Sequence, residues 1–456
     1  MNSINPANGQ IIKEYAVEDF ASVHTKLTNL QSAFLSWKQL PITKRIEVIN
    51  NAAYLLETNK AEYAYIITAE MGKVKKQAIQ EIEKCVLACE YYAKNATEYL
   101  VNKPIKAEGL KSYVHYSPLG IILGIMPWNF PFWQVFRFTI PTLLAGNVIM
   151  LKHASLVPGC SLALESIFTT AAEDLNLQVF RSILVDSRQM KDIIVDPFVQ
   201  AVTLTGSVEA GKKVAAIAGG QIKKTVLELG GSDPYIVLAD ADINNAAIAC
   251  AKGRLINCGQ SCIAAKRLIV VQDVYDEFLT CLIKIFSELK IGDPNDVSTD
   301  IGPLASKQVL DTIVDQVNRT IAAGATCHFG GEKVNREGYY YLPTILTNIP
   351  IDSPAMQEEI FGPVASVFCV ANEQEAIELA NNTEFGLGAA IFTQNLEHAA
   401  ELAEHYIHAG NVFVNSIVAS DPRLPFGGVK KSGYGRELSE FGIHEFVNIK
   451  TIKIDH

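Results

Sequence analysis

The 456-residue sequence lacks several features that would place it in common protein classes. Lys and Arg number 39 against 49 Asp and Glu, and the net charge of −10 argues against nucleic acid or an anionic membrane as a partner. The longest apolar stretch, residues 120–127, is too short to cross a bilayer. The first residues do not form a signal peptide. We therefore expect a cytoplasmic protein that binds neither nucleic acid nor membrane.

Cysteine and histidine patterns typical of disulfide frameworks or metal sites are also missing. The nine cysteines are odd in number, and no Cys-x-x-Cys occurs. In a chain of this length, the pattern indicates a reducing compartment in which most thiols are small buried residues. The nine histidines are scattered, and His405 with His408 is better explained by a solvated helix surface than by a ligand pair. We expect no metal.

What is present is enough apolar sequence for large cores. Hydrophobic residues make up 49% of the chain, and its length predicts two or three domains. Residues 18–105 have helical apolar spacing, and short strands are expected at 113–116 and 121–125. Strand candidates alternating with helical segments then follow at 148–151, 182–185, 201–204 and 225–229. This alternation is typical of βαβ units with a parallel sheet.

A second alternating block begins near Asp240. Its clearest elements are a helix near 243–256, a strand at 267–271, and helices at 274–289 and near 307–322. The fold class predicted is therefore α/β, with two tandem parallel-sheet domains. Residues 446–454 alternate apolar and polar side chains, as a strand with one buried face does. Pairing with another subunit and an edge position in its own domain explain that strand equally well.

Residues 257–262, Asn-Cys-Gly-Gln-Ser-Cys, present Cys262 among small and hydrogen-bonding residues. Most single cysteines are buried and inert, but this polar setting favours a nucleophile, whose pKa must fall below that of a free thiol. Cys258 is either a packing residue, which we favour, or a resolving thiol in a reversible disulfide. Glu228 ends an apolar run and precedes two glycines. That setting favours a general base with a raised pKa over an ordinary surface acid.

Other polar groups follow predicted strands. Asn129 stands among aromatic residues and prolines at 127–131, where its amide can donate to an oxyanion, whereas Trp128 is equally explained as core. Residues 205–211 combine a strand end, a glycine and a helix start, which together form a phosphate cradle. The usual Gly-x-Gly-x-x-Gly pattern is absent there. Lys152 at a strand end either reaches ribose hydroxyls or is simply solvated.

Six motifs, taken together and in this order, resemble the NAD(P)-dependent aldehyde dehydrogenase superfamily over nearly the whole chain. They are PWNFP at 127–131, TGS at 205–207, LELGG at 227–231, NCGQSC at 257–262, EEIFGP at 358–363 and PFGGVKKSGYGRE at 425–437. The resemblance implies an aldehyde dehydrogenase-like fold whose arm joins subunits into a homodimer or homotetramer. The implied domains are a cofactor-binding domain (1–108 and 127–238), a catalytic domain (239–424) and a small β oligomerisation arm (109–126 and 425–456).

The resemblance also implies a role for each matching residue. Cys262 is the nucleophile, Glu228 the general base, and Asn129 the oxyanion donor together with the backbone N–H of Cys262. NAD or NADP is the implied cofactor. The residues implied to bind its ribose hydroxyls, pyrophosphate and nicotinamide end are Trp128, Lys152, Ser155, Gly206, Ser207, Leu229, Glu359 and Phe361.

Within the superfamily the chain most resembles succinate-semialdehyde dehydrogenases of the shorter bacterial type. The segments LKHAS at 151–155, LELGGSDP at 227–234 and FGGVKKSGYGRELSEFGIHEF at 426–446 carry this similarity. An anionic aldehyde needs a cation, and the resemblance implies that Arg137 binds its carboxylate, assisted by Ser420, with Phe426 also at the substrate. The expected reaction is oxidation of succinic semialdehyde to succinate through a thiohemiacetal and a thioester.

Three positions depart from the family pattern. Ile256 stands where related enzymes can carry a second arginine, with Arg423 as a conceivable replacement. Phe138 replaces a lysine that many members use in proton relay. Ser155 replaces the acid that often restricts members to NAD, which keeps NADP among the expected cofactors.

Two other functions remain open. The chain is alternatively an aldehyde dehydrogenase for another small or aromatic aldehyde, with Arg137 serving only structure. It is also conceivable as a catalytically silent structural or cofactor-sensing homologue. The intact Cys262, Glu228 and Asn129 disfavour the second alternative.

Overall fold

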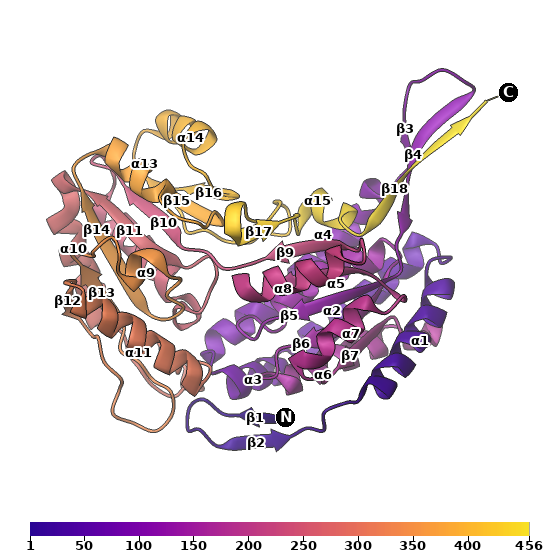
Figure 1. The fold of residues 1–456 in the computed structure, drawn as a ribbon, viewed down its shortest axis with the longest axis horizontal. Coiled ribbons are helices and arrows are strands. Elements are labelled where there is room, and N and C mark those ends of the chain that lie inside the picture. The colour runs from indigo at the N-terminus through magenta and orange to yellow at the C-terminus, as the bar shows by residue number, and fades with distance from the viewer. Residues whose placement is uncertain (456) are drawn as a thin grey trace.

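Two mixed, mostly parallel sheets and one small antiparallel sheet organise residues 1–455, the part of the chain that the computed structural model describes (Figure 1). The expected α/β architecture with two tandem parallel-sheet units is thereby confirmed. A short antiparallel pair, β1 (Asn2–Ile4) and β2 (Ile11–Glu14), precedes the first helix. None of the helices in the described range is both long and apolar enough to span a bilayer.

The first large sheet has six strands in the order β17-β9-β8-β5-β6-β7. Only β17 runs antiparallel to its neighbour. The strands are β5 (Ile121–Met126), β6 (Val148–His153), β7 (Phe180–Ile183), β8 (Val199–Thr205), β9 (Lys224–Glu228) and β17 (Gly433–Tyr434). The four strands predicted between 148 and 229 are all confirmed, with ends shifted by at most two residues.

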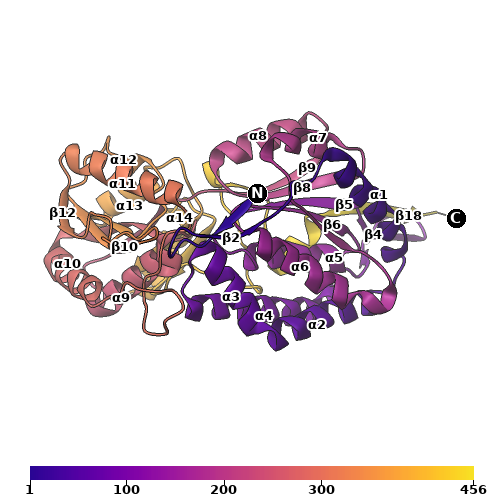
Figure 2. The same cartoon turned by 90° about the horizontal axis from the view of Figure 1, so that it is seen from below.

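Helices cover both faces of this sheet (Figure 2). One face carries α1 (Phe20–Trp37), α7 (Met190–Val195) and α8 (Val208–Gly219), and the other carries α5 (Trp133–Leu144) and α6 (Pro158–Ala171). Outside α5 and α6 lies a further layer formed by α2 (Ile42–Thr58), α3 (Lys60–Met71) and α4 (Lys75–Tyr99). The helical character predicted for 18–105 is confirmed, apart from the short strand β3 (Lys103–Pro104) near its end.

The second large sheet has seven strands in the order β12-β13-β14-β11-β10-β15-β16. They are β10 (Asp233–Val237), β11 (Ala265–Val271), β12 (Thr326–Phe329), β13 (Thr344–Thr347), β14 (Val364–Val370), β15 (Gly388–Phe392) and β16 (Asn411–Val414). Its helices are α9 (Ile243–Leu255), α10 (Gln272–Ser287), α11 (Lys307–Ala322), α12 (Pro354–Gln357), α13 (Glu373–Asn381) and α14 (Leu396–His405). Separate apolar clusters fill its two faces, which is why β10 and β11 are buried throughout.

The crossing between the two sheets occurs earlier in the chain than the sequence predicts. β10 pairs with β11 and β15, so the second sheet already includes residues 233–237. The boundary expected near Asp240 therefore lies in the connection between Glu228, the last residue of β9, and Asp233. This connection carries the glycine pair Gly230 and Gly231, and it places Glu228 at the carboxyl edge of the first sheet.

The small sheet projects from the body of the molecule and contains the C-terminal strand (Figure 1). Its order is β18-β4-β3, formed by β18 (Val447–Ile454), β4 (Lys111–Pro118) and β3 (Lys103–Pro104). β5 belongs to the six-stranded sheet, and α15 (Ser439–His444) packs on α4 and α5. The small sheet therefore differs from the expected arm of 109–126 and 425–456: it also contains 103–104, lacks 121–126, which pair with β6 and β8, and takes only 447–454 from the C-terminal segment.

Candidate active site

Cys262 follows a loop with unusual backbone geometry between α9 and β11. Asn257, Cys258 and Gly259 have successive φ angles of 52°, 55° and 73°. A Cβ at Gly259 would lie 2.1 Å from the carbonyl oxygen of Gly362, so only glycine permits this approach. The side chain of Asn257 donates to the carbonyls of Asn129 at 2.8 Å and Gln260 at 3.1 Å. These contacts hold the loop in a conformation that would otherwise be unfavourable.

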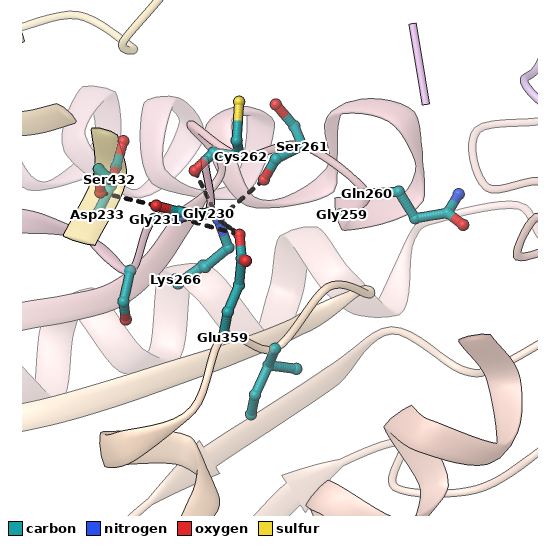
Figure 3. Close-up of polar contacts among 12 residues, drawn as sticks. Gly230, Gly231, Asp233, Gly259, Gln260, Ser261, Cys262, Lys266, Glu359 and Ser432 are labelled. Atoms are coloured by element: carbon teal, nitrogen blue, oxygen red, sulfur yellow. Dashed lines mark hydrogen bonds and ion pairs between the residues drawn. The ribbon is translucent and has the colours of Figure 1, made fainter. Parts of the chain in front are cut away.

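A buried lysine that the sequence analysis did not identify ties this loop to a second motif. Lys266 Nζ donates to the carbonyls of Ser261 at 2.9 Å and Cys262 at 2.7 Å, and it pairs with Glu359 Oε1 at 3.1 Å. Glu359 also accepts from the backbone N–H of Gly231 at 3.2 Å. Figure 3 shows the Cys262 thiol directed away from this network. Lys266 thus fixes the backbone of Cys262 while its thiol stays available.

Burial dominates the electrostatics of the thiol and the carboxyl predicted to act on it. Burial raises the pKa of Cys262 to about 12, while Arg137 and Lys266 oppose that rise. Glu228 is 2% exposed, and its carboxyl oxygens accept no hydrogen bond from residues 1–455. Burial and the charge of Glu437 raise its pKa well above the usual range, against the opposing effect of Arg137. A carboxyl with a raised pKa is suited to exchange protons near neutral pH.

Asn129 is positioned by a buried ion pair from the helical layer. Its amide donates to the carbonyl of Gln260 at 3.1 Å, which leaves one N–H of the amide for a ligand. Lys73 Nζ donates to the carbonyl of Asn129 at 2.8 Å and pairs with Glu81. Glu81 in turn accepts from the backbone N–H groups of Phe132 at 2.8 Å and Trp133 at 3.0 Å. Neither Lys73 nor Glu81 was identified from the sequence.

One cavity of about 270 Å³ brings most of the predicted residues together; we call it the cofactor-side cavity. The predicted residues on its wall are Trp128, Asn129, Gly206, Ser207, Leu229, Cys262, Glu359 and Phe361. Glu228 immediately precedes the wall residue Leu229. Lys152 and Ser155 are not on this wall. Lys152 is half-buried at the end of β6, where burial lowers its pKa.

The residues of this cavity fit a dinucleotide. Ser207 caps α8, accepting from the backbone N–H of Ala210 at 3.3 Å. The first N–H groups of a helix have no partner within the helix and are available to an anion. A Cβ at Gly206 would meet no atom nearer than 3.6 Å, so protein packing does not require glycine there. Space beside a helix N-terminus suits a pyrophosphate. The Trp128 and Phe361 rings meet edge to face at 5.8 Å, which forms an aromatic wall.

The predicted substrate residues lie apart from the cofactor-side cavity. Arg137 is 2% exposed and forms a buried ion pair with Glu437, and its guanidinium lies 5.0 Å from the Phe426 ring centroid. Ser420 Oγ instead accepts from Lys84 Nζ at 2.8 Å and from Trp133 Nε1 at 3.0 Å. These placements leave the roles proposed for the three residues as predictions.

Two further sequence expectations have a clear structural setting. Arg423 is exposed and pairs with Asp421 at 2.6 Å, so in this structure it does not replace the arginine missing at Ile256. Cys258 is buried in the apolar core of the second sheet, and its thiol donates to the carbonyl of Gly302 at 3.5 Å. Burial raises its pKa to about 12. Both Cys258 and Cys262 are free thiols, and Cys258 occupies a packing position.

One signal in the sequence points to the residues that were missed. β11 is an otherwise apolar strand that begins Ala-Lys-Arg, and a strand buried throughout cannot hold two cations without partners. Lys266 finds its partners in the cysteine loop, and Arg267 donates to the carbonyls of Ser232, Leu379 and Ala380. No comparable signal exists for Lys73 and Glu81, whose pairing depends on how α4 packs.

Comparisons with known proteins agree with this site. The model of the aldehyde dehydrogenase family matches residues 1–452. A probable NADP⁺-dependent succinate-semialdehyde dehydrogenase of Synechocystis is 50% identical over 452 residues, covering 99% of both chains. An NADP⁺-dependent succinate-semialdehyde dehydrogenase of Mycobacterium leprae is 44% identical over 457 residues, again covering 99% of both. The crystal structure of succinic semialdehyde dehydrogenase from Streptococcus pyogenes with NADP⁺ superposes with a TM-score of 0.97 at 36% identity, covering 100% of both chains.

Proposed function

Because the chain belongs to the aldehyde dehydrogenase family, we propose that it oxidises succinic semialdehyde to succinate with NADP⁺. The observation that carries this proposal is the cofactor-side cavity. It brings together a cysteine next to a hydrogen-bonded loop, a free amide N–H on Asn129 and the residues before a helix N-terminus. The relatives that support the substrate and cofactor match over their full length.

Cys262 is the nucleophile in this proposal. The thiol first gives its proton to water; the thiolate sulfur then forms a bond to the aldehyde carbon as the C=O π bond breaks and its electron pair moves to oxygen. Arg137 and Lys266 favour the thiolate, because both lower the pKa of Cys262 against the effect of burial. The oxygen of the former carbonyl becomes negative and accepts hydrogen bonds from the free amide N–H of Asn129 and the backbone N–H of Cys262.

The cofactor supplies one step. A bound NADP⁺ would supply the hydride acceptor that oxidation of the thiohemiacetal to a thioester requires. Ser207 and the N-terminus of α8 would hold its pyrophosphate, Glu359 a ribose, and Phe361 the nicotinamide end. Ser155 lies in an exposed position and carries no negative charge that would repel a 2′-phosphate.

Glu228 completes the cycle as general base. It takes a proton from water, the resulting hydroxide attacks the thioester carbon, and the C–S bond breaks to release succinate and the Cys262 thiol. Burial without a hydrogen-bond partner gives Glu228 the raised pKa that this work needs. A retained base favours hydrolysis over transfer of the acyl group to another thiol.

The projecting sheet is proposed as a subunit contact. β18 pairs with β4 along its whole length, so its other edge offers unpaired backbone groups, and Ile449 is 62% exposed. An open edge with apolar side chains on a projecting arm favours a homodimer or homotetramer. Light scattering on the full chain tests this, with a monomeric mass as the contrary result.

The first test of the proposed function is steady-state reduction of NADP⁺ and NAD⁺ with succinic semialdehyde and with butanal, an uncharged aldehyde of equal carbon number. We expect strong preference for the anionic aldehyde and for NADP⁺. Equal turnover of butanal would support the rival assignment, an aldehyde dehydrogenase for another small aldehyde. The absence of turnover with any aldehyde would favour a catalytically silent homologue.

A further inference from the structure

A second cavity, of about 490 Å³, lies between α4, α9, α10 and the start of α5; we call it the aldehyde-side cavity. Phe130 and Trp133 line it, whereas Asn129 and Gln134 line the cofactor-side cavity. The turn 129–134 therefore separates the two spaces. Ile256, at the start of the cysteine loop, forms another part of its wall.

Lys84 is an unusual cation on this wall. It is half-buried on α4, and its ammonium lies 4.3 Å from the Trp133 ring centroid. Within residues 1–455 it forms no ion pair with a carboxylate, and its hydrogen-bond partner is Ser420 Oγ at 2.8 Å. Of the other charged groups on this wall, Glu81 pairs with Lys73 and Asp300 pairs with Lys76, whereas Lys252 is exposed and forms no ion pair within residues 1–455. Lys84 therefore retains two N–H groups for an anion.

Ser420 adds a neutral donor beside Lys84. Its oxygen accepts hydrogen bonds from both Lys84 and Trp133, so its own hydroxyl hydrogen is free to be donated. Ser420 is 7% exposed, which limits competition from water. The Lys84 ammonium and the Ser420 hydroxyl are in direct contact, so each can donate to one of the two oxygens of a single carboxylate.

Arg137 is less available for that task. Its guanidinium is paired with Glu437, donates to Thr205 Oγ1 at 3.3 Å and packs on Phe426. If Arg137 turned to a substrate carboxylate, Glu437 would remain buried and unpaired, which is strongly unfavourable. Lys84 nevertheless lies close to the reaction centre, because its cavity is also lined by Phe130, which adjoins Asn129, and by Ile256 at the start of the cysteine loop.

We propose that Lys84, which lines the aldehyde-side cavity, determines substrate specificity by binding the carboxylate of the aldehyde substrate together with the adjacent Ser420. This inference rests on the proposed function, because it concerns how an anionic aldehyde is recognised. The cation that the sequence lacks at Ile256 is supplied from α4 instead. Arg137 remains the ion-pair partner of Glu437 and affects the substrate only through the electrostatic attraction of its positive charge.

The test compares two substrates that differ in one charge: succinic semialdehyde and its methyl ester, methyl 4-oxobutanoate. Lys84→Met removes the ammonium and keeps an unbranched side chain. We expect the KM for succinic semialdehyde to rise about 10- to 100-fold, the loss of one charged hydrogen bond. The ester KM and both kcat values should stay within about twofold, and Lys84→Arg should restore much of the loss.

Lys76→Met is the matched control. Lys76 lines the same cavity from the same helix, but it is exposed and paired with Asp300 at 2.8 Å, so its loss should leave the KM ratio of the two substrates unchanged. An unchanged ratio in Lys84→Met, or an equal rise in KM for both substrates, would overturn the assignment of Lys84. Should Lys84→Met lower Tm strongly, Lys84→Gln provides a second neutral variant for the same comparison.

The same experiment separates failure of this inference from failure of the proposed function. Wild-type enzyme that prefers succinic semialdehyde, combined with an unaffected Lys84→Met variant, would leave the function standing and return carboxylate binding to Arg137. In that case Arg137→Met would raise the KM for the anionic substrate alone. Wild-type enzyme without any preference for succinic semialdehyde over the ester would overturn the proposed function itself, and the role of Lys84 with it.

Discussion

The two cavities beside the cysteine loop differ in how far their polar groups are already satisfied. On the cofactor side, Lys266 contacts Ser261, Cys262 and Glu359, and Glu359 also contacts Gly231. On the aldehyde side, Lys84 has one hydrogen-bond partner in residues 1–455 and faces open space. The first arrangement fixes a geometry, whereas the second leaves donors free for a ligand.

This difference separates the reaction from the choice of substrate. Groups that serve every aldehyde stand in contiguous motifs and are held by one another, because small displacements at the reacting atoms are costly. The groups that we propose to recognise the carboxylate come from α4 and from residue 420, far apart in the chain. Changing them should alter KM for one class of aldehyde while the chemistry continues.

The largest effect expected is on the cofactor side, from Cys262→Ala. Without the sulfur no thiohemiacetal forms, so NADPH production should fall at least about 10⁴-fold. The cavity gains space and loses no charge, so NADP⁺ affinity should stay within about twofold. Stopped-flow absorbance measures the first quantity and calorimetric titration the second. Retained turnover would remove Cys262 as the nucleophile.

Glu228→Gln should cause the next largest loss and change the kinetic pattern. Because thiohemiacetal formation and hydride transfer do not need the base, each active site should still form one NADPH in a rapid burst. The following steady state should be slower by about 10²- to 10⁴-fold, the usual contribution of a general base. A burst in the variant that is absent from the wild type would identify thioester hydrolysis as the impaired step. Unchanged steady-state turnover would contradict the role of Glu228.

The strands and the residues inside the sequence motifs were predictable because they depend on local sequence. The four strands between 148 and 229 and the helix at 307–322 follow from apolar periodicity. Apolar periodicity does not predict which sheet a strand joins, because residues 121–126 and 233–237 would have the same local pattern in either sheet. That is why the boundary was predicted near Asp240 and residues 121–126 were predicted to lie in the arm.

Only part of the site was predicted, because some of its residues stand in local motifs and others depend on long-range packing. Residues inside motifs, such as Cys262, Asn129 and Glu359, were identified and share one cavity. Lys73, Lys84 and Lys266 were not, because a lysine acquires a role only when packing brings a partner from elsewhere in the chain. The partners of Lys84 and Lys73 come from 420 and from the turn after β5.

Lys266→Met tests the cofactor-side cavity, and we expect it to change activity less than Cys262→Ala or Glu228→Gln. The variant removes the contacts to the cysteine loop and leaves Glu359 without its cation. We expect NADP⁺ affinity to fall about tenfold, equivalent to one charged hydrogen bond. The KM ratio of succinic semialdehyde to its ester should not change, which distinguishes this variant from Lys84→Met. A changed ratio would show that the two cavities are coupled more closely than their separate walls indicate.

The smallest effect expected is a dependence of carboxylate binding on pH. Burial, followed by the charge of Arg137, lowers the pKa of Lys84 to about 8, while Cys85, Glu81 and Asp421 oppose that change. The ammonium is therefore present below pH 8 and is lost as the pH rises through that value. Between pH 7 and 8.5 the charged fraction falls about fourfold, so the KM for succinic semialdehyde should rise about fourfold relative to that for butanal.

The comparison with butanal cancels the ionisation of Cys262 and Glu228, because both aldehydes need those groups equally. Lys84→Arg provides the second control, since a guanidinium stays charged over this range and should keep the KM ratio flat. A wild-type ratio that does not change between pH 7 and 8.5, alongside a flat ratio in Lys84→Arg, would mean that a permanently charged group binds the carboxylate. Arg137 would then be that group, and substrate binding would have to draw it away from Glu437.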